Sequence, residues 1–123
     1  MSKQIKIVIG NVEADATLND TSTANKVWDI LPFTSPAMLW GDEIYFDIPL
    51  HIGLEKGASA VVNLGDLAYW PDGPAMCIFL GKTPVSRGNE IRAASAVNVF
   101  GKINDVMALL GKVKSGEKIT VKK

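Results

Sequence analysis

The sequence has little cysteine, histidine and arginine. Cys77 and His51 are the single residues of their kinds in a chain of 123. No disulfide can therefore form within the chain, and a zinc site has no set of cysteine and histidine ligands at a suitable spacing. The two arginines, Arg87 and Arg92, both follow residue 86. We predict no metal, no other cofactor and no Cys–His nucleophile.

The chain also lacks an excess of charge and a long hydrophobic run. Its thirteen basic and thirteen acidic side chains cancel. Because nucleic-acid binding depends on neutralising phosphates, nucleic acid is not expected as the main partner. The opening MSKQIKIVIG alternates apolar and polar residues, so it predicts neither a signal peptide nor a membrane span. A cytoplasmic protein without membrane association is the resulting expectation.

What is present is the composition of an ordinary folded domain, with 47% apolar and 21% charged residues. A chain of this length can bury enough surface to fold without a metal or a disulfide. Neither an internal repeat nor a linker interrupts it, and we predict a single domain over residues 1–123.

The first third of the chain shows two different periods. Apolar residues alternate over 5–9 and 12–18, and Gly10-Asn11 between them favours a tight turn, so a β-hairpin is predicted. The period then changes to that of a helical face, behind capping-competent residues and before Pro32. The residues on this face are Ala24, Val27, Trp28 and Leu31.

Alternation returns in WGDEIYFDIPLHI. One face of this predicted strand carries Ile44, Phe46, Ile48 and Leu50, and the other carries Glu43, Tyr45, Asp47 and His51. Because proline cannot donate to a β-ladder, Pro49 predicts an edge strand or a bulged one.

The remainder is mostly strand pattern. Successive segments predict a hairpin of 66–70 with 75–80 across a PDGP turn, a surface loop over 81–95, a strand over 96–103, a short helix near 106–110 and a last strand over 118–123. The interpretation is a mainly β fold, a closed β-barrel with two short helices.

Three blocks of sequence resemble the small prokaryotic cyclophilin-like family. They are Trp40–Phe46, Gly65–Pro84 and Ser95–Ile103, and the resemblance runs through almost the entire chain. It implies a compact cyclophilin-like barrel with a helix at each open end and a groove on its outer surface.

The departures from true cyclophilins bear on function. Cyclophilins isomerise X-Pro bonds with an arginine in a local F-H-R pattern, whereas here that stretch reads WGDEIYF and residues 1–86 contain no arginine. A carboxylate cannot donate to the imide nitrogen in its place. Only Arg87 or Arg92 could reach in from the loop. The strand Ala75–Phe79 is also altered, and its register leaves open whether Ile78 or Phe79 replaces the pocket phenylalanine.

We interpret the outer groove as a site for a peptide segment or a small molecule, without a catalytic residue. The resemblance places Glu43 and Tyr45 in the groove. Trp70, which precedes Pro71, is expected to brace its turn. The predicted ligand-binding residues are Trp40, Glu43, Tyr45, Phe79, Arg92 and Asn98.

Simpler readings remain open. The Glu43 face could meet solvent as any half-buried strand does, and the aromatic residues could fill the core. The alternative functions are a weak or atypical prolyl isomerase and a non-catalytic subunit or interaction domain with a protein partner.

Overall fold

The computed structural model describes residues 3–123, and this part of the chain is mainly β. The prediction of two short helices is correct for the first, which forms α1, but the second is no more than a turn of 3-10 helix. The elements are β1 (Lys3–Ile9), β2 (Val12–Leu18), α1 (Ser22–Asp29), β3 (Phe33–Pro36), β4 (Met38–Trp40), β5 (Glu43–Asp47), β6 (Ser59–Val62), β7 (Asp66–Trp70), β8 (Ala75–Phe79), β9 (Ile91–Ile103), η1 (Val106–Ala108) and β10 (Lys118–Lys122).

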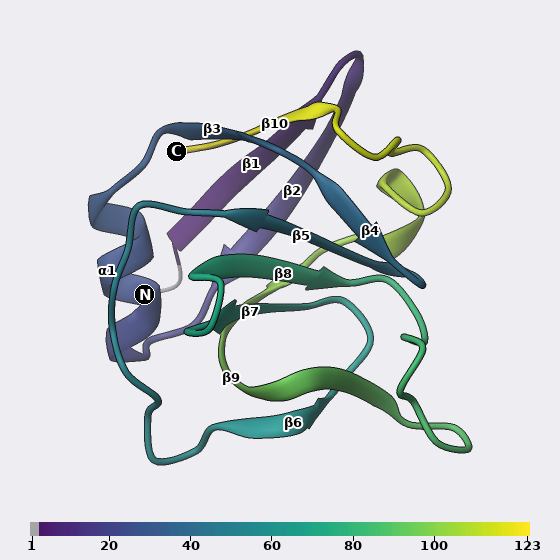
Figure 1. Ribbon diagram of the computed structural model, residues 1–123. Coiled ribbons are helices and arrows are strands. Elements are labelled where there is room, and N and C mark those ends of the chain that lie inside the picture. Colours follow the sequence, from purple (N-terminus) through teal and green to yellow (C-terminus); the bar gives the residue numbers. More distant parts are fainter. Residues whose placement is uncertain (1–2) are drawn as a thin grey trace.

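The strands form one curved antiparallel sheet in the order β3-β10-β1-β2-β9-β7-β8-β5-β4, with β6 paired to β9 (Figure 1). The predicted closed barrel is wrong, because this hydrogen-bonded path ends at β3 and β4. These two strands are successive pieces of chain joined at Ala37, whose backbone N–H donates to Glu117 O at 2.7 Å. One stretch of chain thus supplies both end strands of the sheet. The two ends are joined through the backbone at Ala37, and no β-ladder pairs β3 with β4.

The predicted N-terminal hairpin is confirmed, with Ile9 opposite Val12 and Gly10 at a φ of 56°. Its inward side chains join those of the other strands in the main core. The helix α1 begins where Thr21 Oγ1 accepts from Ala24 N, and it buries Val27 against this core. The buried apolar side chains of the two hairpin strands are Ile5, Ile7, Ile9, Ala14, Ala16 and Leu18.

Pro49 predicted an edge strand or a bulged one, and both alternatives are wrong for β5, which lies between β4 and β8 with a continuous register to each. Pro49 lies two residues beyond the end of β5 at Asp47 and so removes no ladder bond. The register between β5 and β8 places Tyr45 opposite Cys77 and Ile44 opposite Ile78. Ile78 belongs to the main core, whereas Phe79 packs on the outer face of the sheet. The two candidates for the pocket position therefore lie on opposite faces of the sheet.

The strand β9 changes neighbours along its length. Its second half pairs with β7 and β2, while its first half leaves the sheet and pairs with β6 (Figure 1). Its start at Ile91 corrects the predicted surface loop, which had extended to residue 95. The first half of β9 covers the outer face of β7 and β8 and closes a second, smaller core. That core contains Val62, Ala68, Cys77, Phe79, Ala93 and Val97.

Candidate functional site

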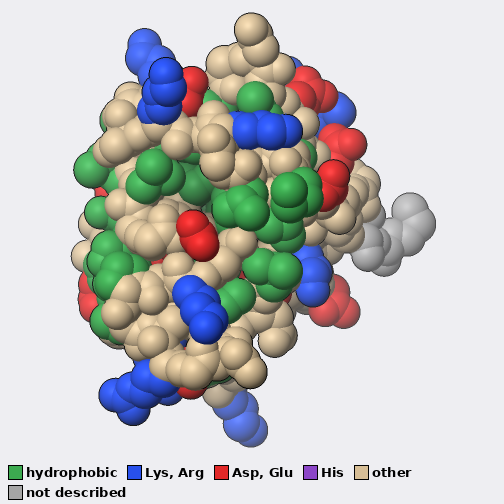
Figure 2. All heavy atoms as spheres, turned by 90° about the vertical axis from the view of Figure 1, so that its right-hand side faces the viewer, with side chains coloured by type: hydrophobic (Ala, Val, Ile, Leu, Met, Phe, Trp, Pro, Cys, Tyr) green, Lys and Arg blue, Asp and Glu red, His purple; other side chains and the backbone are tan. Residues whose placement is uncertain are grey.

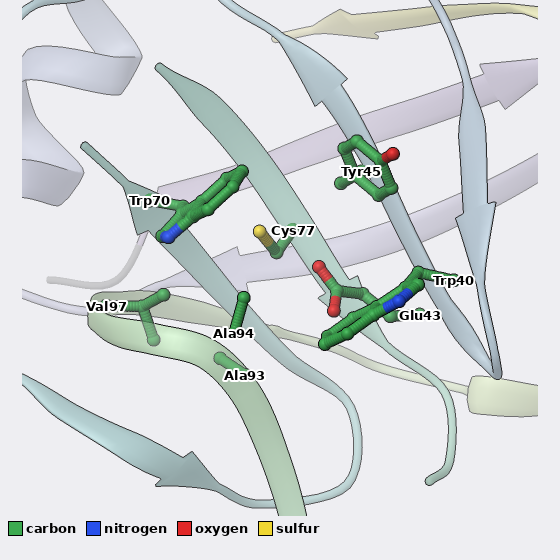
Figure 3. A pocket seen from close by; sticks show the side chains of 8 residues that line it. All are labelled: Trp40, Glu43, Tyr45, Trp70, Cys77, Ala93, Ala94 and Val97. Carbon is green, nitrogen blue, oxygen red and sulfur yellow. The ribbon is translucent and has the colours of Figure 1, made fainter. Parts of the chain in front are cut away.

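A pocket of about 200 Å³ lies where the first half of β9 faces the outer side of the sheet (Figure 3). Four strands of the sheet contribute to it, and β9 supplies the opposite wall. The lining residues are Trp40 from β4, Glu43 and Tyr45 from β5, Trp70 from β7, Cys77 from β8, and Ala93, Ala94 and Val97 from β9.

The walls are aromatic on one side and small on the other. The indole of Trp70 is held by a hydrogen bond of 2.7 Å from its Nε1–H to Ser95 Oγ on β9. Ala93 and Ala94 lie near it with side chains of a single carbon, which leaves the space open. A pocket bounded by rigid rings and methyl groups favours an apolar guest.

The polar feature of the pocket is Glu43, which is only 4% exposed. Its Oε1 is buried and has no hydrogen-bond partner among residues 3–123. Figure 3 shows the carboxyl group turned into the pocket beside Trp40 and Cys77. Burial raises the pKa of Glu43 to about 7, an effect that the neighbouring Cys77 thiol opposes. The carboxyl group is therefore close to half protonated at neutral pH.

The thiol of Cys77 is buried at the floor of this pocket. Burial raises its pKa well above the usual range, and the neighbouring Glu43 carboxyl group adds to the effect. A thiol reacts as its thiolate, so the structure gives Cys77 no activation as a nucleophile.

The native chain should therefore react slowly with a thiol reagent. At pH 8 we expect Ellman's reagent to modify Cys77 at least about tenfold more slowly in the native protein than in the urea-unfolded chain. Release of the coloured thiolate measures the rate, and a single cysteine makes the readout specific to one site. Equal rates in the two states contradict the buried, neutral thiol.

The structure brings together three of the six predicted ligand-binding residues, namely Trp40, Glu43 and Tyr45. Phe79 faces the same side of the sheet but is fully buried within the second core. Neither Arg92 nor Asn98 lines the pocket.

Asn98, on β9, instead makes three hydrogen bonds through its side chain. Its Nδ2 donates to Thr23 Oγ1 at 3.1 Å and to Gly53 O at 3.0 Å, and its Oδ1 accepts from Glu55 N at 2.8 Å. The side chain ties α1 and the loop after β5 to β9.

The two arginines stay away from the pocket. Arg92 donates from Nε to Glu90 Oε2 at 2.6 Å, and its backbone N–H binds Ser86 Oγ. Among the residues that the structure describes, no basic side chain lines the pocket, and Glu43 is the one charged group there. Asp47, on the same strand face as Glu43, is exposed and does not line the pocket.

Sequence reasoning missed five lining residues: Trp70, Cys77, Ala93, Ala94 and Val97. Trp70 was expected to brace its turn, but its ring also faces the pocket. The residues of β9 lay in or beside a segment interpreted as a loop. A usable signal was present, because Ile91, Ala93, Ser95 and Val97 occupy alternate positions, the period of a strand.

A second pocket of about 100 Å³ lies at the end of the sheet near η1. It is lined mostly by apolar side chains, among them Leu39, Leu110 and Val113. Figure 2 shows apolar side chains on this side of the molecule in patches between charged ones. This pocket has no buried polar group without a partner in the described residues, so it gives no chemistry to build on.

Residues 3–123 contain neither a metal-ligand cluster nor a membrane-spanning helix. No three cysteine, histidine or acidic side chains lie close enough to hold a metal ion. No helix of this part of the chain is long and apolar enough to cross a membrane.

The fold and the outer pocket define a cyclophilin-type domain. The chain belongs to the cyclophilin-like family, whose model matches residues 3–122. The resemblance inferred from the sequence is thereby confirmed.

The chain is similar to the solution structure of the hypothetical protein AF2241 from Archaeoglobus fulgidus, with 40% identity and a TM-score of 0.82, over 98% of this chain and 94% of that one. It shares the fold alone with the structure of McbB in complex with tryptophan, at 14% identity and a TM-score of 0.70, over 97% of this chain and 44% of that one. No curated protein matches the sequence.

Proposed function

We propose that the protein binds a small molecule, or one side chain of a peptide segment, in the pocket between β5 and the first half of β9. The observation that carries this proposal is the grouping of Trp40, Tyr45 and Trp70 around a buried carboxyl group. A pocket of apolar walls with one convergent polar group is the usual form of a site for a small ligand.

The size and origin of the pocket support a compact ligand. Its volume of about 200 Å³ accommodates a ring or a short branched group rather than several residues of extended peptide. The walls come from five strands, and β9 is held to β7 by the Trp70–Ser95 hydrogen bond, so the site is formed by rigid elements. Preformed sites of this kind lose little conformational entropy on binding.

Prolyl isomerisation is disfavoured by the same geometry. Catalysis of X-Pro rotation needs a donor that stabilises the twisted amide, and no basic side chain of the described chain lines the pocket. A neutral Glu43 can donate one hydrogen bond, but it carries no positive charge. A binding function therefore agrees better with these side chains than catalysis does.

A ligand in this pocket should depend on the Tyr45 ring. Benzyl alcohol, toluene and short proline peptides serve as probes, each titrated into the protein with fluorescence as the readout. For every probe that binds, we expect Tyr45→Ala to raise its Kd about tenfold, since an aromatic contact contributes about 1.4 kcal/mol. Asp47→Ala is the matched control, because Asp47 lies on the same strand and is exposed outside the pocket. Absence of binding by every probe, or equal effects of both substitutions, contradicts the proposed site.

A protease-coupled assay on a proline peptide separates the two functions. At micromolar protein we expect the isomerisation rate to equal that of buffer. Acceleration that Tyr45→Ala abolishes assigns the pocket to an isomerase instead.

A further inference from the structure

The pocket contains an acceptor that the protein leaves unused. Glu43 Oε1 is buried, turned into the pocket, and without a partner in residues 3–123. Leaving a buried acceptor unpaired costs about 1–3 kcal/mol, and more when it is charged. A guest that brings a hydrogen-bond donor removes this cost, which an apolar guest cannot do.

The surroundings of Glu43 favour a donor that is positively charged. Trp40, Tyr45 and Trp70 present ring systems to the pocket, and a cation is attracted to the face of such rings. An anionic guest is repelled, since it faces both the Glu43 carboxylate and the negative faces of the aromatic rings.

No cation within residues 3–123 fills this role. The arginine of β9, Arg92, is already paired with Glu90. Its neighbours Ala93 and Ala94 line the pocket, and Arg92 does not. The titratable side chains that face Glu43 are Cys77 from β8 and Tyr45 from its own strand, while β4, β7 and β9 contribute apolar or aromatic groups. A cation in the pocket must therefore come from the ligand.

We infer that the ligand is a compact organic amine whose ammonium group binds Glu43 and whose apolar body lies between the aromatic walls. This inference rests on the proposed function and names the chemical class of its ligand. The complex is a buried ion pair in which Glu43 accepts from the ammonium, and charge-assisted hydrogen bonds of this kind are about twice as strong as neutral ones.

The inference predicts a particular pH dependence. An alkylammonium stays protonated at neutral pH, as lysine does, and it pairs with the ionised form of Glu43. With a pKa near 7, about a tenth of the free protein has that form at pH 6 and about nine tenths at pH 8. Affinity for an amine should therefore rise about tenfold between pH 6 and pH 8. A neutral ligand that accepts a hydrogen bond from protonated Glu43 shows the opposite trend.

Isothermal titration with benzylamine and benzyl alcohol tests this directly, because the two probes share one apolar frame. We expect benzylamine to bind at least about tenfold more tightly than benzyl alcohol at pH 8. In Glu43→Gln, we expect the preference for benzylamine and its pH dependence to disappear. Asp47→Asn, an exposed acid on the same face of β5, should leave both unchanged. Unfolding curves of the variants confirm that each is folded.

The outcomes separate the inference from the proposed function. Equal affinities of the two probes, or a preference for the alcohol, overturn the amine inference and leave the binding pocket standing. If neither benzylamine nor benzyl alcohol binds, the amine inference is overturned. If, in addition, no probe of the Tyr45 experiment binds, the proposed function is overturned as well. Amine binding that survives Glu43→Gln places the ammonium elsewhere and likewise overturns the inference.

Discussion

Glu43→Gln should remove a large pH dependence of stability. In the native protein Glu43 keeps its proton up to about pH 7, whereas the unfolded chain releases it near pH 4.5. Between these values the native state binds more protons, so the free energy of unfolding falls as pH rises. The contribution of protonated Glu43 to the free energy of unfolding is fully present below pH 4.5 and is lost as the pH rises through 7, a change of about 3 kcal/mol.

Urea unfolding of both proteins from pH 4.5 to 8 measures this effect. Asp66, whose pKa is also raised by burial, contributes in the same direction in both proteins, so the difference between them isolates Glu43. We expect the variant to gain about 3 kcal/mol relative to the natural chain over this range. A difference that varies by less than about 0.5 kcal/mol contradicts the buried carboxyl group.

Asn98→Ala should destabilise the protein by about 2–4 kcal/mol. The substitution leaves Gly53 O and Glu55 N without their partner and opens space beneath α1, where Asn98 is 2% exposed. Because Asn98 does not line the pocket, ligand affinity should stay within about twofold once the protein is folded.

Urea unfolding with Asn89→Ala as the control checks this role. Asn89 is an exposed asparagine in the loop before β9, so its loss should change stability by less than about 0.5 kcal/mol. If Asn98→Ala instead weakens ligand binding while leaving stability intact, Asn98 belongs to the site as the sequence analysis expected.

The fold was largely readable because alternation and turn residues are local signals. The hairpin of β1 and β2 follows from alternate apolar residues around Gly10, and the hairpin of β7 and β8 from the turn at PDGP. The strands β3, β4 and β6 are three or four residues long, too short for a period to be seen. The open end of the sheet could not be predicted, since it depends on which strands pair on either side of Ala37.

The site was half readable for a different reason. Trp40, Glu43 and Tyr45 lie in one block of sequence, and the resemblance placed Glu43 and Tyr45 in the groove, but the pocket needs a second wall that is distant in sequence. That wall is the first half of β9, and Gly- and Ser-rich neighbours made residues 81–95 resemble a loop. Without the wall, Glu43 reads as a solvated acid. With it, the same side chain is buried and its pKa is raised.

The most direct test of the binding pocket is an NMR titration that follows the chemical shifts of the tryptophan indole N–H signals. Trp40 and Trp70 line the pocket, whereas Trp28 lies on α1 beneath the side chains of Lys3 and Lys123. On adding benzylamine at pH 8, the account predicts that the signals of Trp40 and Trp70 shift in a saturable way and that of Trp28 does not. Shifts at Trp28 alone, or none at any indole, contradict it.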